Sequence, residues 1–132
     1  MPFTFRELEA WKQGMSLVEE CYKATTSFPK TETYGLMSQL RRAAVSIPAN
    51  LAEGHARRST RAFLNHISIA IGSQAELETC IELATRLRFV TAEQADRLMA
   101  DAASVGRILY GLYRAIERKT SSSDLRPLTS DL

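Results

Sequence analysis

The chain has 132 residues, of which 45% are hydrophobic, and it carries 17 Lys and Arg against 15 Asp and Glu, for a formal net charge of +2. This size suits one domain, and the six glycines and four prolines are too few for a disordered or fibrous chain. No run of about 18 apolar residues could span a membrane, and the N-terminal residues lack the pattern of a signal peptide. We therefore expect a soluble, cytoplasmic protein in which the isolated Cys21 and Cys80 stay reduced.

The first predicted helix lies before Pro29. Thr4 and Glu7 have the spacing of a capping box, and apolar residues then recur three and four apart over residues 8–22. Pro29 ends this helix because proline cannot continue the hydrogen-bond ladder.

The second predicted helix contains a proline. Thr31 or Thr33 can cap it, and its apolar face runs to about His55 through Pro48. Pro48 removes the hydrogen bond to the carbonyl of Ala44, at a cost of about 3 kcal/mol. We expect a kink there, with Ser46 or Asn50 satisfying exposed backbone groups and core packing offsetting the lost bond.

The third and fourth predicted helices have clear N-terminal signals. Ser59 or Thr60 caps a helix that runs to about residue 87. Thr91 and Gln94 form a capping box for the last helix, which ends near residue 119. This last helix has a heptad seam made of Leu98, Ala102, Val105, Leu109, Leu112 and Ile116.

Four long helices with short connections predict an all-α fold, an antiparallel up-down-up-down four-helix bundle whose second helix is kinked at Pro48. The bundle should comprise residues 1–119. Residues 120–132 are polar and read as a C-terminal tail.

Two of these helices have apolar surfaces wider than one core contact needs. In the second helix, Val45, Pro48 and Ala52 lie beside the core stripe. In the fourth helix, the corresponding strip is Met99, Ala103, Gly106, Tyr110 and Tyr113. Either the core is thick, with aromatic edges, or this second surface is buried against another subunit.

Gln74 and Glu78 fall close to the apolar stripe of the third helix. A carboxylate in that position needs a partner or an outlet to solvent. Arg41, at the border of the apolar face of the second helix, is a candidate partner for Glu78.

Arginine is the residue type that best indicates a function. The chain has thirteen arginines and four lysines. The planar guanidinium group of arginine suits phosphate and carboxylate groups, although the base composition of the gene can give the same excess of arginine over lysine. A basic segment surrounds the turn between the second and third helices, and a basic ridge follows the last helix. Cations near a helix C-terminus also favour its dipole and aid solubility, so both interpretations stay open. The candidate nucleic-acid-binding residues are Arg42, Arg57, Arg58, Arg61, Arg107, Arg114 and Arg118.

Catalytic and metal-binding patterns are missing from the sequence. His55 and His66 are the only histidines, and neither belongs to a short-spaced cluster of metal ligands. No phosphate-binding loop, dinucleotide fingerprint or nucleophile motif occurs. We therefore expect no metal, no cofactor and no enzymatic activity.

The stretches FPKTETYGLMSQLRRAAVSIPANLAEG and FLNHISIAIGSQAELET carry a resemblance to a known family. Over about residues 5–118 the chain resembles the small four-helix-bundle proteins encoded in intervening sequences of bacterial large-subunit ribosomal RNA genes. It is also similar to their relatives, the accessory variability determinant proteins of diversity-generating retroelements.

The resemblance implies a four-helix protomer in a ring-like homopentamer, with a basic surface available to nucleic acid and, in the retroelement branch, to a reverse transcriptase. It brings no catalytic motif. Two functions follow as expectations. The first is a non-catalytic pentamer that binds RNA or DNA through phosphates with weak sequence specificity. The second is a protein-binding adaptor for a reverse transcriptase or other nucleic-acid enzyme.

Overall fold

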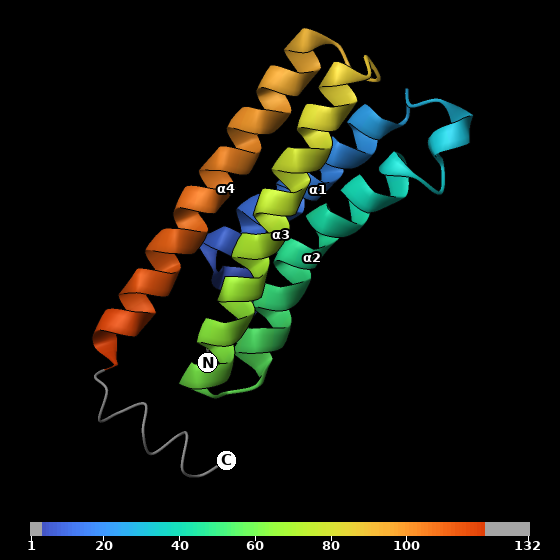
Figure 1. The fold of residues 1–132 in the computed structure, drawn as a ribbon. Helices are drawn as coiled ribbons and strands as arrows, with labels where there is room; N and C mark the ends of the chain where they lie inside the picture. The colour runs from blue at the N-terminus through green and yellow to red at the C-terminus, as the bar shows by residue number, and fades with distance from the viewer. Residues whose placement is uncertain (1–3, 121–132) are drawn as a thin grey trace.

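The structure, a computed structural model, describes residues 4–120 (Figure 1). These residues form four α-helices and two short 3-10 helices and contain no strand, which confirms the all-α prediction. The elements are η1 (Phe5–Glu7), α1 (Glu9–Thr25), η2 (Lys30–Glu32), α2 (Leu36–Ala56), α3 (Thr60–Arg86) and α4 (Ala92–Lys119). All but the first residue of the predicted tail lie outside the described residues, so the proposed domain division stays a prediction.

The four helices surround one core. In Figure 1 successive helices run in opposite directions, with the α2–α3 turn and the end of α4 at one end of the bundle. Each helix packs against two others, in the pairs α1–α2, α2–α3, α3–α4 and α4–α1. None of the described helices combines the length and the hydropathy needed to cross a membrane.

The predicted apolar stripes supply the core. One side chain in each of three helices illustrates this: Leu40 of α2, Ile67 of α3 and Leu109 of α4 are almost completely buried. Each fully buried Leu or Ile side chain stabilises the fold by about 1.5–3 kcal/mol relative to an exposed one. The seam of α4 is buried from Leu98 to Leu109, and its last two members pack against the core while partly exposed.

The caps predicted for α3 and α4 are confirmed. The Ser59 hydroxyl accepts a hydrogen bond from the backbone N–H of Ala62 at 3.2 Å. At the start of α4, the Thr91 hydroxyl accepts from the N–H of Gln94 at 3.1 Å, and the Gln94 side chain accepts from the N–H of Thr91 at 2.9 Å. Both caps satisfy N–H groups that lack a partner within the helix.

The caps predicted for α1 and α2 are wrong. Thr4 makes no capping hydrogen bond, because η1 intervenes and α1 begins only after Leu8. Neither Thr31 nor Thr33 caps α2, which follows Gly35. Instead, the Glu32 carboxylate on η2 accepts from the N–H of Leu36 at 2.9 Å, so the chain turns once more before α2 begins.

Pro48 lies inside a continuous α2 and is buried against α1. A Cβ atom added to Gly14 would lie 3.5 Å from Pro48 Cδ, so the proline ring packs directly on the glycine backbone. Nearby, the Asn50 amide donates to the carbonyl of Ser46 at 2.8 Å, whereas the carbonyl that loses its helical donor to Pro48 is that of Ala44. The predicted kink itself stays a prediction.

Candidate nucleic-acid interface

Three of the candidate arginines lie at the tight α2–α3 turn. Arg57 and Arg58 follow the last residue of α2, and Arg61 lies in the first turn of α3. Arg58 has a φ of 56° and its N–H bonds to the carbonyl of His55, the left-handed ending that helices often adopt. This conformation reverses the chain within three residues, so that all three arginines lie at one end of the bundle.

The Arg57 guanidinium is paired, but at the surface. It donates to the Glu53 carboxylate one helical turn away at 2.8 Å, and both side chains are more than half exposed. An exposed pair of this kind contributes only about 0–1 kcal/mol, so a phosphate can compete for the guanidinium at little cost. Glu53 nonetheless lowers the positive charge of the turn.

The end of α4 reaches the same end of the bundle (Figure 1). Arg58 shares a cavity of about 410 Å³ with Leu112 and Ile116 of α4. Arg61 shares another, of about 480 Å³, with Tyr113 and Glu117. Arg118, in the last turn of α4, is exposed there.

Arg107 and Arg114 line a different feature, the α3–α4 groove, of about 530 Å³. Gln74 forms its floor: its amide donates to the carbonyl of Ala102 at 3.0 Å and to the Glu78 carboxylate. A Cβ at Gly106 would lie 2.9 Å from the Gln74 amide nitrogen, so the absence of a side chain at Gly106 leaves room for the Gln74 amide in this position.

The wide apolar strip predicted for α4 borders this groove. Ala103 and Gly106 line it together with Tyr110, whose side chain is 52% exposed. Glu78, half-buried at the edge of the groove, offsets part of the positive charge of the two arginines. The groove is therefore amphipathic and not purely basic.

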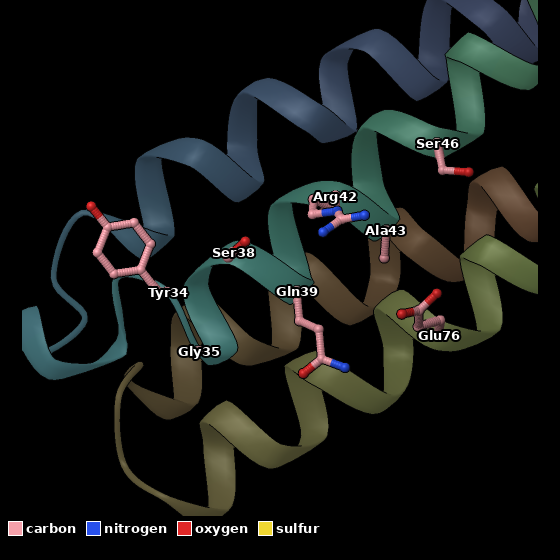
Figure 2. A pocket seen from close by; sticks show the side chains of 8 residues that line it. All are labelled: Tyr34, Gly35, Ser38, Gln39, Arg42, Ala43, Ser46 and Glu76. Carbon is pink, nitrogen blue, oxygen red and sulfur yellow. The ribbon is translucent and has the colours of Figure 1, made fainter.

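Arg42 is far from both arginine groups. It lies in α2, 15 residues before Arg57, which corresponds to about 22 Å along the helix axis. It lines a polar cavity of about 510 Å³ with Tyr34, Gln39 and Glu76 (Figure 2). The structure thus brings Arg57, Arg58, Arg61 and Arg118 to one end, and separates the other three candidate residues into two further places.

Arg41 does not pair with Glu78. Its Nε donates to the Thr25 hydroxyl at 2.8 Å, and its guanidinium carbon lies 4.2 Å from the centre of the Tyr22 ring. The physical reason is that this edge of α2 packs against the last turn of α1, whereas Glu78 points to α4. Arg41 therefore joins α1 to α2 and is not part of the candidate interface.

A polar cluster joins α2 to α3 beneath the surface. The Ser46 and Ser73 hydroxyls are 2.7 Å apart, and Asn50 Oδ1 lies 2.9 Å from His66 Nδ1. No group of His, Cys, Asp or Glu among residues 4–120 could hold a metal ion. Both cysteines are buried free thiols, and burial is the main cause that raises the pKa of Cys21 to about 12, with the charges of Asp101 and Glu20 adding to it.

The geometry defines an all-α, four-helix protein with arginines concentrated at one end. Residues 6–111 match the family of the 23S rRNA-intervening sequence protein. The chain therefore belongs to this family.

Several solved structures match the chain, and one of them shows the same fold. It is a protein of unknown function from the S23 ribosomal protein family of Bacteroides thetaiotaomicron VPI-5482, with a TM-score of 0.73 and 21% sequence identity. The match covers 79% of this chain and 97% of the other. No curated protein matches the chain. The relationship to proteins of diversity-generating retroelements stays a prediction.

Proposed function

We propose that this protein is a non-catalytic homopentamer in the cytoplasm that binds nucleic acid through phosphates, with weak sequence specificity. The observation that carries the proposal is the position of Arg57, Arg58 and Arg61 at the α2–α3 turn, at the same end of the bundle as Arg118. Guanidinium groups suit phosphate oxygens, and four of them on one end form a compact positive surface.

Assembly strengthens a modest patch. A net charge of +2 per chain gives one protomer little attraction for nucleic acid. Five copies in a ring would repeat the arginine end five times and let several weak phosphate contacts act together. The pentamer is supported by the apolar strip of α4, where Tyr110 is 52% exposed beside Ala103.

The family name refers to a sequence within a ribosomal RNA gene and names no binding partner, so the choice of nucleic acid as the partner class depends on the arginine end. Phosphate contacts do not distinguish RNA from DNA, so the proposal includes both. Arg107, Arg114 and Arg42 are secondary contacts, since they lie away from the arginine end.

A second candidate function, a protein-binding adaptor for a reverse transcriptase or other nucleic-acid enzyme, is favoured by the α3–α4 groove. The groove combines the exposed Tyr110 ring with the charges of Arg107, Arg114 and Glu78. Exposed aromatic and arginine side chains are enriched at protein interfaces. The similarity to the retroelement proteins points to the same partner.

The decisive experiment neutralises the arginine end and compares it with an equal change elsewhere. The test variant replaces Arg57, Arg58 and Arg61 with Gln. The control replaces Arg86, Arg88 and Arg97 with Gln, and these three residues are exposed at the opposite end of the bundle. Arg88 has a positive φ of 63°, as Arg58 has, so both variants change one residue with this backbone conformation. Both variants lose three positive charges.

Binding to an RNA duplex and a DNA duplex of unrelated sequences is measured by fluorescence anisotropy from about 50 mM salt upward. We expect the test variant to bind both duplexes more weakly, and the slope of log affinity against log salt to fall by up to about 3 per protomer. The control should keep the wild-type slope. If the wild-type protein binds neither duplex at the lowest salt, the proposal is wrong and the adaptor becomes the better candidate.

A further inference from the structure

An apolar cavity of about 410 Å³ lies at the arginine end of the bundle. Its apolar walls come from segments far apart in the sequence: Leu8 before α1, Phe63 of α3, and Leu112 and Ile116 of α4. The last three of these side chains pack against the core but are only partly buried. The cavity therefore leaves apolar surface in contact with water, and covering that surface would be favourable.

The Phe63 ring, which forms one wall of the cavity, is held in place by α2. Its plane is at 85° to the His55 ring, and the two ring centroids are 5.6 Å apart. A Cβ at Gly54 would come within 3.3 Å of Phe63 Cδ1, so the ring also rests on the α2 backbone. Because this wall is already ordered, an occupant of the cavity does not have to immobilise it.

The chain leaves α4 close to this cavity. Ile116 lines the cavity, and Thr120 lies one helical turn later. The Thr120 hydroxyl donates to the Ile116 carbonyl at 2.5 Å, and its φ of −113° and ψ of 111° are extended, so α4 ends there. Five residues of extended chain span up to about 17 Å, whereas one helical turn is about 5.4 Å long. Position 125 is therefore within reach of the cavity.

The sequence beyond Thr120 complements the cavity in shape of side chain and in charge. Residues 121–132, which lie outside the described residues, read SSSDLRPLTSDL and contain two aspartates against one arginine. Asp124 directly precedes Leu125. The cavity combines apolar walls with the exposed Arg58. A leucine and a carboxylate side by side match an apolar wall and a guanidinium side by side.

We propose that residues 121–132 fold back and dock on this cavity. The Leu125 side chain occupies the cavity, and Asp124 pairs with Arg58 beside it. Burial of the leucine supplies most of the favourable free energy, because an exposed ion pair contributes little. The pair instead fixes the direction in which the segment lies.

A second cavity between α3 and α4, of about 480 Å³, suits this segment less. Four of its seven lining residues are polar or charged, among them Asn65 and Ser68. The carboxylate of Glu117 also lines it and would repel Asp124. This second cavity therefore provides a control site at the same end of the bundle.

The docked segment would compete with nucleic acid for the arginine end. Asp124 and a phosphate oxygen bind the same guanidinium of Arg58, so only one of them can hold it fully. This consequence rests on the proposed function, whereas the docking itself does not. The docking is therefore tested without nucleic acid.

Disulfide formation in the 132-residue chain tests the docking. The test variant carries Thr60→Cys, in the apolar cavity, and Arg126→Cys, next to Leu125. The control variant carries Asn65→Cys, in the second cavity, and Arg126→Cys. Both are incubated in a glutathione buffer, and peptide mapping identifies each bond. We expect the test pair to form about 10-fold more disulfide than the control pair, and Leu125→Ser to remove the difference.

Equal disulfide yields in the two pairs would overturn the docking and leave the cavity to residues 1–3 or to a second copy of the chain. Disulfides that join two chains would overturn docking within one chain and assign the cavity to the segment of a neighbouring copy.

Anisotropy with the two duplexes separates this inference from the proposed function. In the otherwise unchanged chain, Leu125→Ser should raise the affinity for both duplexes about 2- to 10-fold at low salt, because Arg58 is released. An unchanged affinity would contradict the competition for Arg58. A disulfide preference without any duplex binding would support the docking and overturn only the proposed function.

Discussion

Gly54 of α2 lies directly against His66 of α3. A Cβ atom added to Gly54 would fall 2.5 Å from the Cβ and 3.0 Å from the Cγ of His66. Because the nearer atom is fixed to the α3 backbone, the two helices could accommodate a methyl group only by moving apart. This contact sets the separation of α2 and α3 just before the turn that carries the arginines.

Gly54→Ala should therefore destabilise the protein. Overpacking costs about 1–3 kcal/mol, while alanine gains up to about 1 kcal/mol of helix propensity over glycine, so the net loss should be about 1–2 kcal/mol. Urea unfolding measures the difference. Gly72→Ala is the matched control, because a Cβ at Gly72 meets nothing within 4 Å, and it should raise stability. Equal gains in the two variants would contradict the close contact.

Pro48→Ala tests how packing offsets the missing hydrogen bond. Alanine restores an N–H that can donate to the Ala44 carbonyl, but it removes ring atoms that pack on Gly14. These effects oppose each other, so the free energy of unfolding should stay within about 1–2 kcal/mol of wild type while the path of α2 changes. Urea unfolding and a crystal structure of the variant check both parts. A wild-type crystal structure with α2 straight from residue 44 to 52 would remove the reason to expect a kink.

Tyr110→Glu tests the homopentamer. Tyr110 is 52% exposed in the protomer, so a carboxylate there should leave the fold intact, but it would be buried in a subunit interface. We expect light scattering to show a lower mass, with the melting temperature of the protomer little changed. Leu109→Glu, at the neighbouring fully buried position, should instead unfold the chain. A wild-type mass near 14.7 kDa at micromolar concentration would argue against any assembly.

The cysteines should resist thiol reagents in the folded protein. With the Cys21 pKa raised to about 12, its thiolate fraction at pH 8 is about one in ten thousand, and raising the pH toward 12 increases it. Cys80 is also buried, and its pKa is raised mainly by burial. A colourimetric disulfide reagent should react with neither at pH 8 and with both after unfolding in urea. Fast reaction of either thiol in the native protein would show that α1 or α3 opens readily.

Local signals in the sequence predicted much of this fold. The Ser59 cap and the Thr91–Gln94 box involve residues three apart, so their geometry depends only on the helix that they begin. The start of α2 was missed because its cap comes from Glu32, on a separate short helix that no periodicity marks. The partner of Arg41 was missed because it depends on which neighbouring helix packs against one edge of α2.

The candidate site was only partly predictable. Residues near one another in the chain, such as Arg57, Arg58 and Arg61, also gather in space because a turn holds them together. Arg42, Arg107 and Arg114 share the same charge but lie elsewhere, since residue type carries no information about distance between helices.

The bond between Asn50 and His66 determines which way each side chain is turned. The Asn50 amide nitrogen must face the Ser46 carbonyl, which only accepts, so Oδ1 faces the imidazole and Nδ1 of His66 carries the hydrogen. The Asn50 amide cannot flip without losing its bond to Ser46, and the imidazole cannot rotate by half a turn without facing Oδ1 with a carbon atom. The link between α2 and α3 therefore fixes the orientation of both side chains.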